Sequence, residues 1–308
     1  MPGSILPPMP STRRLSRIGL AATLVLVAFG AFTRGSGSGY GCADQWPLCE
    51  GGALGGLLPR LEFEMIIEWT HRWIAALVGL IAIATAIQAW RTHRSHRLVV
   101  RASLAAVLAI GIQAWIGRSV VKADLDADLV SLHLAISMSI VALFAVVVVA
   151  TTPELHRREP TNPRWVALYG LGASAAFAVL LLGSLVHNQY VAGWPLVEGA
   201  LIPEFSSSLI LIHWTHRLAA GLGLFYFAYL WRITRTERRP APEASLAKWA
   251  FWAYAVNIGV GLLHVLTEVE SSAVVTLHLA ASTIVWTLMI IATTVAVSKQ
   301  AERAISSG

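Results

Sequence analysis

The sequence has few charged side chains and only two cysteines. Charged residues make up 13% of the 308 positions, whereas hydrophobic residues make up 56%, and the mean hydropathy is +0.64. This composition places the chain in the membrane class. The glycine-rich run at 35–39 has no strand before it and no Gly-Lys-Ser/Thr after it, so it predicts a flexible turn and not a phosphate-binding loop.

Apolar runs long enough to cross a bilayer, about 20 residues each, recur eight times. They lie near 16–34, 64–90, 98–118, 129–151, 165–188, 208–232, 247–267 and 272–297. The first run follows three arginines, as a signal peptide does, but the fifth run is its counterpart in an internal repeat. We therefore expect it to stay as a helix in an all-α integral membrane fold of eight transmembrane helices.

Most of the 23 Lys and Arg residues fall on one side of the membrane if the N-terminus lies inside. Loops on the cytoplasmic side are enriched in Lys and Arg, so we expect both termini to be cytoplasmic. The pI near 9.7 then follows from topology and does not indicate a nucleic-acid partner.

Three short words each occur twice, and two of them repeat at a fixed spacing. Trp69-Thr70-His71-Arg72 recurs as Trp214-Thr215-His216-Arg217, and Leu132-His133-Leu134-Ala135 recurs as Leu277-His278-Leu279-Ala280. Both offsets are 145 residues (216 − 71 and 278 − 133). The word at 46–51 has its counterpart at 194–199. A self-similarity of this length indicates two copies of one structural unit.

We predict two tandem four-helix bundles related by a pseudo-twofold axis along the membrane normal. The predicted division is an inner tail at 1–17, a bundle at 18–152, an inner linker at 153–164, a second bundle at 165–298 and an inner tail at 299–308.

Four histidines belong to the repeat, namely His71, His133, His216 and His278. Each lies about 4–8 residues from the outer end of its apolar run, which is roughly 6–12 Å deep. Ionisable residues inside a membrane are usually functional. Two imidazoles per bundle suit a flat metal macrocycle held between helices, and haem iron accepts histidine as an axial ligand. Zinc needs a compact tetrahedral set, which these runs lack, and a proton relay does not need matched pairs. We therefore predict two haem sites, with these four residues as metal ligands.

Arg72 and Arg217 each directly follow a predicted ligand. Neighbours on a helix are separated by about 100°, so neither arginine shares its histidine's direction. Each could reach outward to a haem propionate as a cofactor-binding residue, or could pack at the membrane interface, and both interpretations stay open. Three other histidines, His187, His213 and His264, have no histidine equivalent and receive no role.

The two halves differ beside the first ligand. Glu68 lies one helical turn before His71 and shares its face, whereas the position 145 residues later is His213. A carboxylate beside an iron ligand can move a proton or stabilise developing positive charge. We therefore predict that Glu68 is catalytic and that the second half holds a resident cofactor.

Cys42 and Cys49 lie in the first outer loop, on the oxidising side where disulfides persist, and we predict that they form a disulfide. A structural staple and a redox-active pair feeding electrons to a nearby site remain alternatives. The second half has Val197 in place of Cys49, so the pair serves one half only.

These residues resemble a known family. The words Glu68-Trp69-Thr70-His71-Arg72, Cys42-Ala43-Asp44-Gln45-Trp46-Pro47-Leu48-Cys49 and Gly193-Trp194-Pro195-Leu196, with the two Leu-His pairs, resemble haem A synthase of the cytochrome oxidase assembly pathway over about residues 16–297. The resemblance implies oxidation of a methyl group of haem O to the formyl group of haem A. It also implies that haem O binds between His71 and His133 and haem b between His216 and His278, with Glu68 matching the catalytic carboxylate.

The resemblance further implies a bacterial cell membrane with lipid contact, haem O delivered by a haem O synthase, and an electron partner that the sequence does not identify. Some relatives carry a second cysteine pair, which this chain lacks. Two other classes remain open: a di-haem membrane electron carrier similar to the cytochromes b, and a transporter built from repeats. Pigment content separates the transporter from the other two, and conversion of haem O to haem A separates the enzyme from the carrier.

Overall fold

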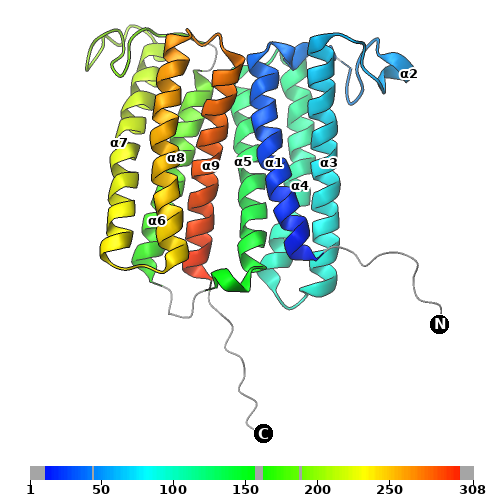
Figure 1. The fold of residues 1–308 in the computed structure, drawn as a ribbon. Coiled ribbons are helices and arrows are strands. Elements are labelled where there is room, and N and C mark those ends of the chain that lie inside the picture. Colours follow the sequence, from blue (N-terminus) through cyan, green and yellow to red (C-terminus); the bar gives the residue numbers. More distant parts are fainter. Residues whose placement is uncertain (1–10, 44, 157–161, 187–188, 299–308) are drawn as a thin grey trace, which may run out of the picture.

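The computed structural model describes residues 11–43, 45–156, 162–186 and 189–298, and the regular structure within these ranges is helical (Figure 1). The long helices are α1 (Thr12–Gly35), α3 (Phe63–Thr92), α4 (Arg97–Lys122), α5 (Ala127–Ala150), α6 (Pro163–Leu185), α7 (Ser208–Thr236), α8 (Ala241–Leu266) and α9 (Ser272–Val297). Short helical segments are η1 (Ser38–Tyr40), α2 (Ala53–Gly56) and η2 (Pro153–Leu155).

Seven of the described long helices are long and apolar enough to cross a membrane. The all-helical membrane class predicted from the sequence is thus confirmed. The long helix outside this set is α7, which carries His213, His216 and Arg217. These polar side chains lower the mean hydropathy of α7. Residues predicted to bind a cofactor therefore also keep α7 outside the set of seven.

Side-chain caps explain where several helices begin. Ser11 accepts a hydrogen bond from the backbone N–H of Arg14, and α1 therefore starts four residues before the predicted position 16. Asp126 caps α5 by accepting from the N–H groups of Asp128 and Leu129. Ser207 and Ser271 do the same for α7 and α9.

The helix bounds repeat with the spacing of the sequence words. Helix α7 begins 145 residues after α3 (208 − 63), and α9 begins 145 residues after α5 (272 − 127). Helices α1, α3, α4 and α5 stand together beside the group α6–α9, with the helix axes running in the same general direction (Figure 1). Each group has a core of its own, around Phe144 and Val78 in the first and around Trp165, Tyr169 and Phe227 in the second.

Helix α9 packs against α1 and α5, and α5 also packs against α6, so these four helices join the two groups. Three hydrogen bonds between described residues cross the junction, one of them from the Thr283 hydroxyl to the Met138 sulfur at 3.8 Å. The indole Nε1 of Trp286 donates to the carbonyl O of Met138 at 3.3 Å, and the hydroxyl of Ser184 donates to that of Ser131 at 2.8 Å. Large apolar side chains on the outside of the groups are exposed, as lipid contact requires.

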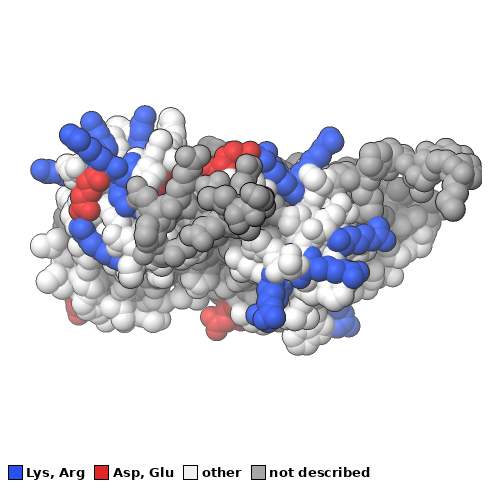
Figure 2. Space-filling model, turned by 90° about the horizontal axis from the view of Figure 1, so that it is seen from below, with Lys and Arg blue, Asp and Glu red and all other residues white. Residues whose placement is uncertain are grey.

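One end of the molecule carries many basic side chains. Lys and Arg side chains are spread over the end at which α1 begins and α9 ends (Figure 2). We call this the basic end. The opposite end, where long connections join α1 to α3 and α6 to α7, is called the loop end. At the basic end Arg239 forms a buried ion pair with Glu243 at 2.8 Å, and the Tyr169 hydroxyl also donates to this carboxylate.

Candidate functional site

The four repeated histidines lie at one depth below the loop end. His71 and His216 are each eight residues after the first residue of α3 and α7, and His133 and His278 are each six after the first residue of α5 and α9. At about 1.5 Å per residue, these positions are roughly 9–12 Å inside the helices. The structure therefore brings all four predicted ligands to the same level.

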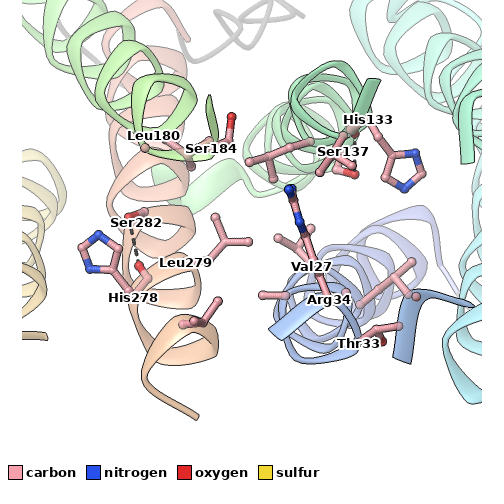
Figure 3. Close-up of a pocket in the computed structure, with 18 of the residues that line it drawn as sticks. Val27, Thr33, Arg34, His133, Ser137, Leu180, Ser184, His278, Leu279 and Ser282 are labelled. Atoms are coloured by element: carbon pink, nitrogen blue, oxygen red, sulfur yellow. Dashed lines mark hydrogen bonds between the residues drawn. The ribbon is translucent and has the colours of Figure 1, made fainter. Parts of the chain in front are cut away.

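One cavity of about 850 Å³ reaches all four imidazoles. Its lining comes from both helix groups and from both long connections at the loop end. Figure 3 places His133 and His278 on opposite sides of this space, with Arg34 of α1 and Ser184 of α6 between them. His71 and His133 line the cavity from the first helix group, and His216 and His278 line it from the second.

Each of the four imidazole rings packs against a glycine of the preceding long helix. A Cβ atom built on that glycine would lie 2.9–3.3 Å from the histidine Cε1. The pairs are Gly30 with His71, Gly117 with His133, Gly183 with His216 and Gly261 with His278. A Cβ on Gly183 would be too close to the His216 ring, whereas on the other three glycines it would require the ring to shift by a few tenths of an ångström.

The ring nitrogens of the four histidines have few hydrogen bonds within the described part of the protein. The Nδ1–H of His216 donates to the carbonyl O of Val179 at 3.0 Å, which leaves Nε2 as the lone-pair nitrogen. In His71, His133 and His278 the Nδ1 atom is buried and has no hydrogen-bond partner among the described residues. A histidine that binds a metal through Nε2 has its second nitrogen oriented by a nearby group, and the His216 contact has this form.

An amide and a hydroxyl hold the turn that carries each ligand of α5 and α9. Gln113 of α4 donates to the carbonyl O of His133 and to the Ser137 hydroxyl, and Asn257 of α8 donates to the Ser282 hydroxyl. Both serines also donate to the carbonyl O of the histidine one turn earlier. The 145-residue offset between the two serines is the signal that could have identified them.

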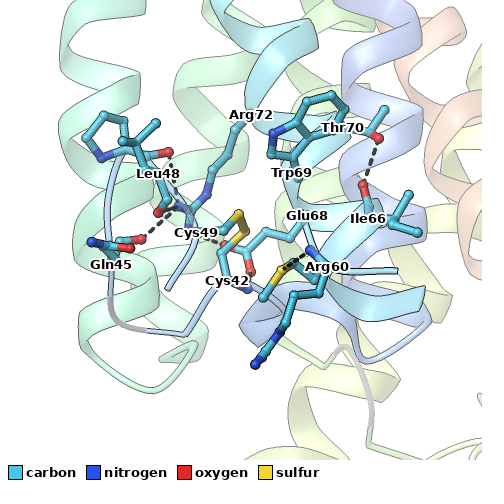
Figure 4. Close-up of a disulfide and its surroundings, with 12 residues drawn as sticks. Cys42, Gln45, Leu48, Cys49, Arg60, Ile66, Glu68, Trp69, Thr70 and Arg72 are labelled. Atoms are coloured by element: carbon cyan, nitrogen blue, oxygen red, sulfur yellow. Dashed lines mark hydrogen bonds and ion pairs between the residues drawn. A yellow bond between two sulfur atoms is a disulfide. The ribbon is translucent and has the colours of Figure 1, made fainter. Parts of the chain in front are cut away.

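Glu68 is a buried carboxylate of the first helix group, with 4% of its surface exposed. Its Oε2 accepts the backbone N–H of Cys42 at 2.7 Å, and its Oε1 pairs with the guanidinium of Arg72 (Figure 4). Glu68 lines the cavity that contains His71. Glu68 and His71, which lie one helical turn apart in the sequence, therefore belong to one site.

Arg72 and Arg217 mainly contact loop backbone. The Nη1 of Arg72 donates to the carbonyl oxygens of Gln45, Pro47 and Leu48 (Figure 4). Arg217 donates to three carbonyl oxygens of the other long connection, those of Val191, Gly193 and Leu196. The repeated arginine thus fastens a long connection over the cavity in each half, a role that the sequence analysis did not include.

The repeated tryptophan has a matching task. The indole Nε1 of Trp69 donates to the carbonyl O of Leu57 at 2.9 Å, and that of Trp214 to Leu201 at 2.8 Å. In the word Trp-Thr-His-Arg, the first and last residues therefore hold the loop while the histidine faces the cavity.

The predicted bond between Cys42 and Cys49 is present in the structure. Both cysteines are fully buried and pack against Met65 and Trp69. The disulfide closes the loop segment that Arg72 fastens, directly beside Glu68 (Figure 4).

Two of the three unassigned histidines have defined surroundings, whereas His187 lies outside the described residues. His213, the counterpart of Glu68, is buried and donates from Nε2 to the carbonyl O of Gln189 at 3.0 Å. His264 stacks on His278, with 5.9 Å between ring centroids and 12° between planes. The repeat did not predict this stacking, because Val120 stands at the equivalent position of the first half, by the 144-residue offset that also relates Gly117 to Gly261.

The donor set fits a flat macrocycle better than a bare ion. Among the described residues, no three His, Cys, Asp or Glu side chains come together as a metal-ion site. The histidines instead lie two in each helix group, around a cavity with a largely apolar lining that both groups share. This arrangement can hold two planar groups through axial imidazoles.

Comparison with known proteins gives consistent matches. Residues 57–290 match the COX15-CtaA family, described as cytochrome oxidase assembly protein. The chain is 26% identical over 290 residues to a protein of Symbiobacterium thermophilum named heme A synthase, covering 87% of this chain and 92% of that protein. It is 30% identical over 222 residues to the heme A synthase of Alkalihalophilus pseudofirmus, covering 69% and 73% of the two chains. It is also 30% identical over 234 residues to the heme A synthase of Halalkalibacterium halodurans, covering 72% of this chain and 75% of that protein.

Proposed function

The chain belongs to the COX15-CtaA family of cytochrome oxidase assembly proteins, and we propose that it is a haem A synthase, an oxidoreductase that converts the methyl group of haem O to the formyl group of haem A. The proposal rests on one difference between the two halves. The four histidines repeat, but Glu68 of the first half is replaced by His213 in the second. Two equivalent histidine pairs line one cavity, and among the described residues a buried carboxylate lines it in the first half only.

In this proposal His71 and His133 hold the substrate haem O, and His216 and His278 hold a resident haem b. When bound, haem b supplies one-electron transfer. The glycine that faces each ring and the Val179 carbonyl on His216 orient the imidazoles toward the cavity. Arg72 and Arg217 keep a proposed cofactor-binding role through the loops that they fasten over the cavity.

Glu68 is the proposed catalytic residue. Oxidation of a methyl group on a conjugated ring passes through electron-poor carbon and releases protons. A buried carboxylate can stabilise the developing positive charge and accept a proton. The Cys42 N–H and the Arg72 guanidinium fix both oxygens of Glu68, so its position is set before the substrate arrives.

We also propose the finer topology. Helices α1, α3, α4 and α5 form one transmembrane bundle and α6–α9 the other, related by a pseudo-twofold axis along the membrane normal. The 145-residue spacing between the starts of α3 and α7 and between those of α5 and α9 supports it, and α7 is then the eighth span. The basic end faces the cytoplasm with both termini, as the distribution of Lys and Arg suggests. The domain boundaries, the delivery of haem O by a haem O synthase and an electron partner belong to the same proposal.

The test is to express the protein with and without a supply of haem O and to analyse the extracted haems by chromatography. We expect haem b in both preparations and haem A only when haem O is supplied. Haem b without haem A under both conditions would instead identify an electron carrier. A protein without any haem would contradict both functions.

A further inference from the structure

Arg34 is, within the described part of the chain, the one cation of the cavity lining without a hydrogen-bond or ion-pair partner for its side chain. Among the described residues, the charged side chains that line the cavity are Arg34, Glu68, Arg72 and Arg217. Glu68 is paired with Arg72, and the two repeated arginines donate to loop carbonyls. No described group accepts a hydrogen bond from the Arg34 guanidinium, and none forms an ion pair with it.

The position of Arg34 is inside the protein and not at the lipid surface. It occupies the last turn of α1 and is partly buried. In Figure 3 its side chain extends from α1 into the space between His133 and His278. A guanidinium that only sought water would extend away from the molecule, whereas this one points into the junction between the helix groups.

The register of α1 relates Arg34 to the first histidine pair. Gly30, against which the His71 ring packs, lies four residues earlier on α1. Four residues are about one helical turn and roughly 6 Å along the axis. Arg34 therefore stands on the loop-end side of the His71 ring, on about the same face of α1.

We propose that Arg34 is a carboxylate-binding residue, and that it pairs with a propionate of the haem held by His71 and His133. This rests on the proposed function, which brings such a haem into the cavity. The lining carries three cations against one carboxylate, and an uncompensated charge in an apolar environment is unfavourable. A propionate supplies the missing negative charge, and the planar guanidinium offers five N–H donors, two of which match a carboxylate.

The test compares haem O with its dimethyl ester, in which both propionates are uncharged. Full-length protein from cells that make no haem O is titrated with each compound, and binding is followed by the change in the haem absorption spectrum. We expect the parent chain to bind the free acid more tightly than the ester. In Arg34→Gln that preference should fall by about tenfold or more, which is the value of one charge-assisted hydrogen bond. Arg34→Lys should keep part of it.

The matched control is Arg60→Gln, which removes an exposed arginine that pairs with Glu62 outside the cavity. Its acid-to-ester ratio should equal that of the parent. An unchanged acid-to-ester affinity ratio in Arg34→Gln would overturn the inference and leave the proposed function standing. The same result is expected if Arg34 binds a lipid phosphate instead of a propionate. A parent chain that binds neither compound would overturn both.

Discussion

The carboxylate of Glu68 accepts the backbone N–H of Cys42, with 2.7 Å between Oε2 and the nitrogen. Cys42 in turn is bonded to Cys49. The proposed catalytic group is therefore attached directly to the disulfide loop. The second half has His213 and Val197 at the equivalent positions, so this connection belongs to the proposed substrate half alone.

Replacing Glu68 with Gln should abolish product formation while leaving haem bound. Glutamine keeps an oxygen that can accept the Cys42 N–H but loses the negative charge and the ability to take a proton. We expect the rate of haem A formation to fall by about a hundredfold or more. The measurement is extracted haem A per folded protein. Glu64→Gln, an exposed position one turn earlier on α3, is the control and should keep the parent rate. Haem A formed at the parent rate by Glu68→Gln would disprove the catalytic assignment.

The double variant Cys42→Ser, Cys49→Ser should impair the first half selectively. A loop this short contributes about 2–3 kcal/mol at most by the chain-entropy estimate, so the protein should still fold. Without the bond, the loop segment that carries the Cys42 N–H is less constrained, and Glu68 loses a fixed partner. We expect weaker haem O binding and less haem A, with second-half haem b unchanged. Equal losses of haem b and haem O binding would show that the disulfide acts on the whole molecule.

Two stacked histidines permit a direct test of the haem b ligands. His278 and His264 lie ring against ring, yet only His278 belongs to the repeat. His278→Ala should remove most haem b, as should His216→Ala, because each deletes an axial ligand. His264→Ala should retain haem b in the reduced-minus-oxidised spectrum. If His264→Ala lost haem b and His278→Ala retained it, His264 would be the ligand.

The sequence predicted those features that depend on residues close together in the chain. Hydropathy located the long helices, and the repeated words located His71, His133, His216 and His278, because a helix face and a 145-residue offset can be read from the sequence without coordinates. The matching starts of α5 and α9 follow the same offset.

Features that depend on loop structure or on distant helices were not predictable in this way. The sequence places Arg72 beside His71, but the carbonyl oxygens that it contacts are positioned by the fold of the loop at 45–48. The glycines of α1 and α6 that face histidines are 153 residues apart (183 − 30). They were missed because the spacing of the repeat is 145 and the first helix of each half is shifted relative to it.

Alanine substitutions at the glycines of α6 and α8 should affect the resident haem b to different degrees. Helix α6 contacts His216 twice, through the Val179 carbonyl and through Gly183 one turn later. A Cβ on Gly183 would lie 2.9 Å from Cε1 of His216, which is too close, so Gly183→Ala must displace the ring or the helix. A Cβ on Gly261 would lie 3.3 Å from His278, a contact that a small shift relieves. Gly170 on α6 and Gly259 on α8 have open space around the added atom.

We therefore expect Gly183→Ala to lower haem b content and to change the low-spin electron paramagnetic resonance signal, with a smaller change in Gly261→Ala. Gly170→Ala and Gly259→Ala should match the parent. Alanine favours a helix over glycine by up to about 1 kcal/mol, so reduced helix propensity cannot explain a loss that occurs at only one position of each pair. A signal that is identical in Gly183→Ala and Gly170→Ala would mean that the glycine does not position His216. If the signal changes while the protein stays folded, the ring orientation of His216 depends on α6, a helix that supplies no ligand of its own.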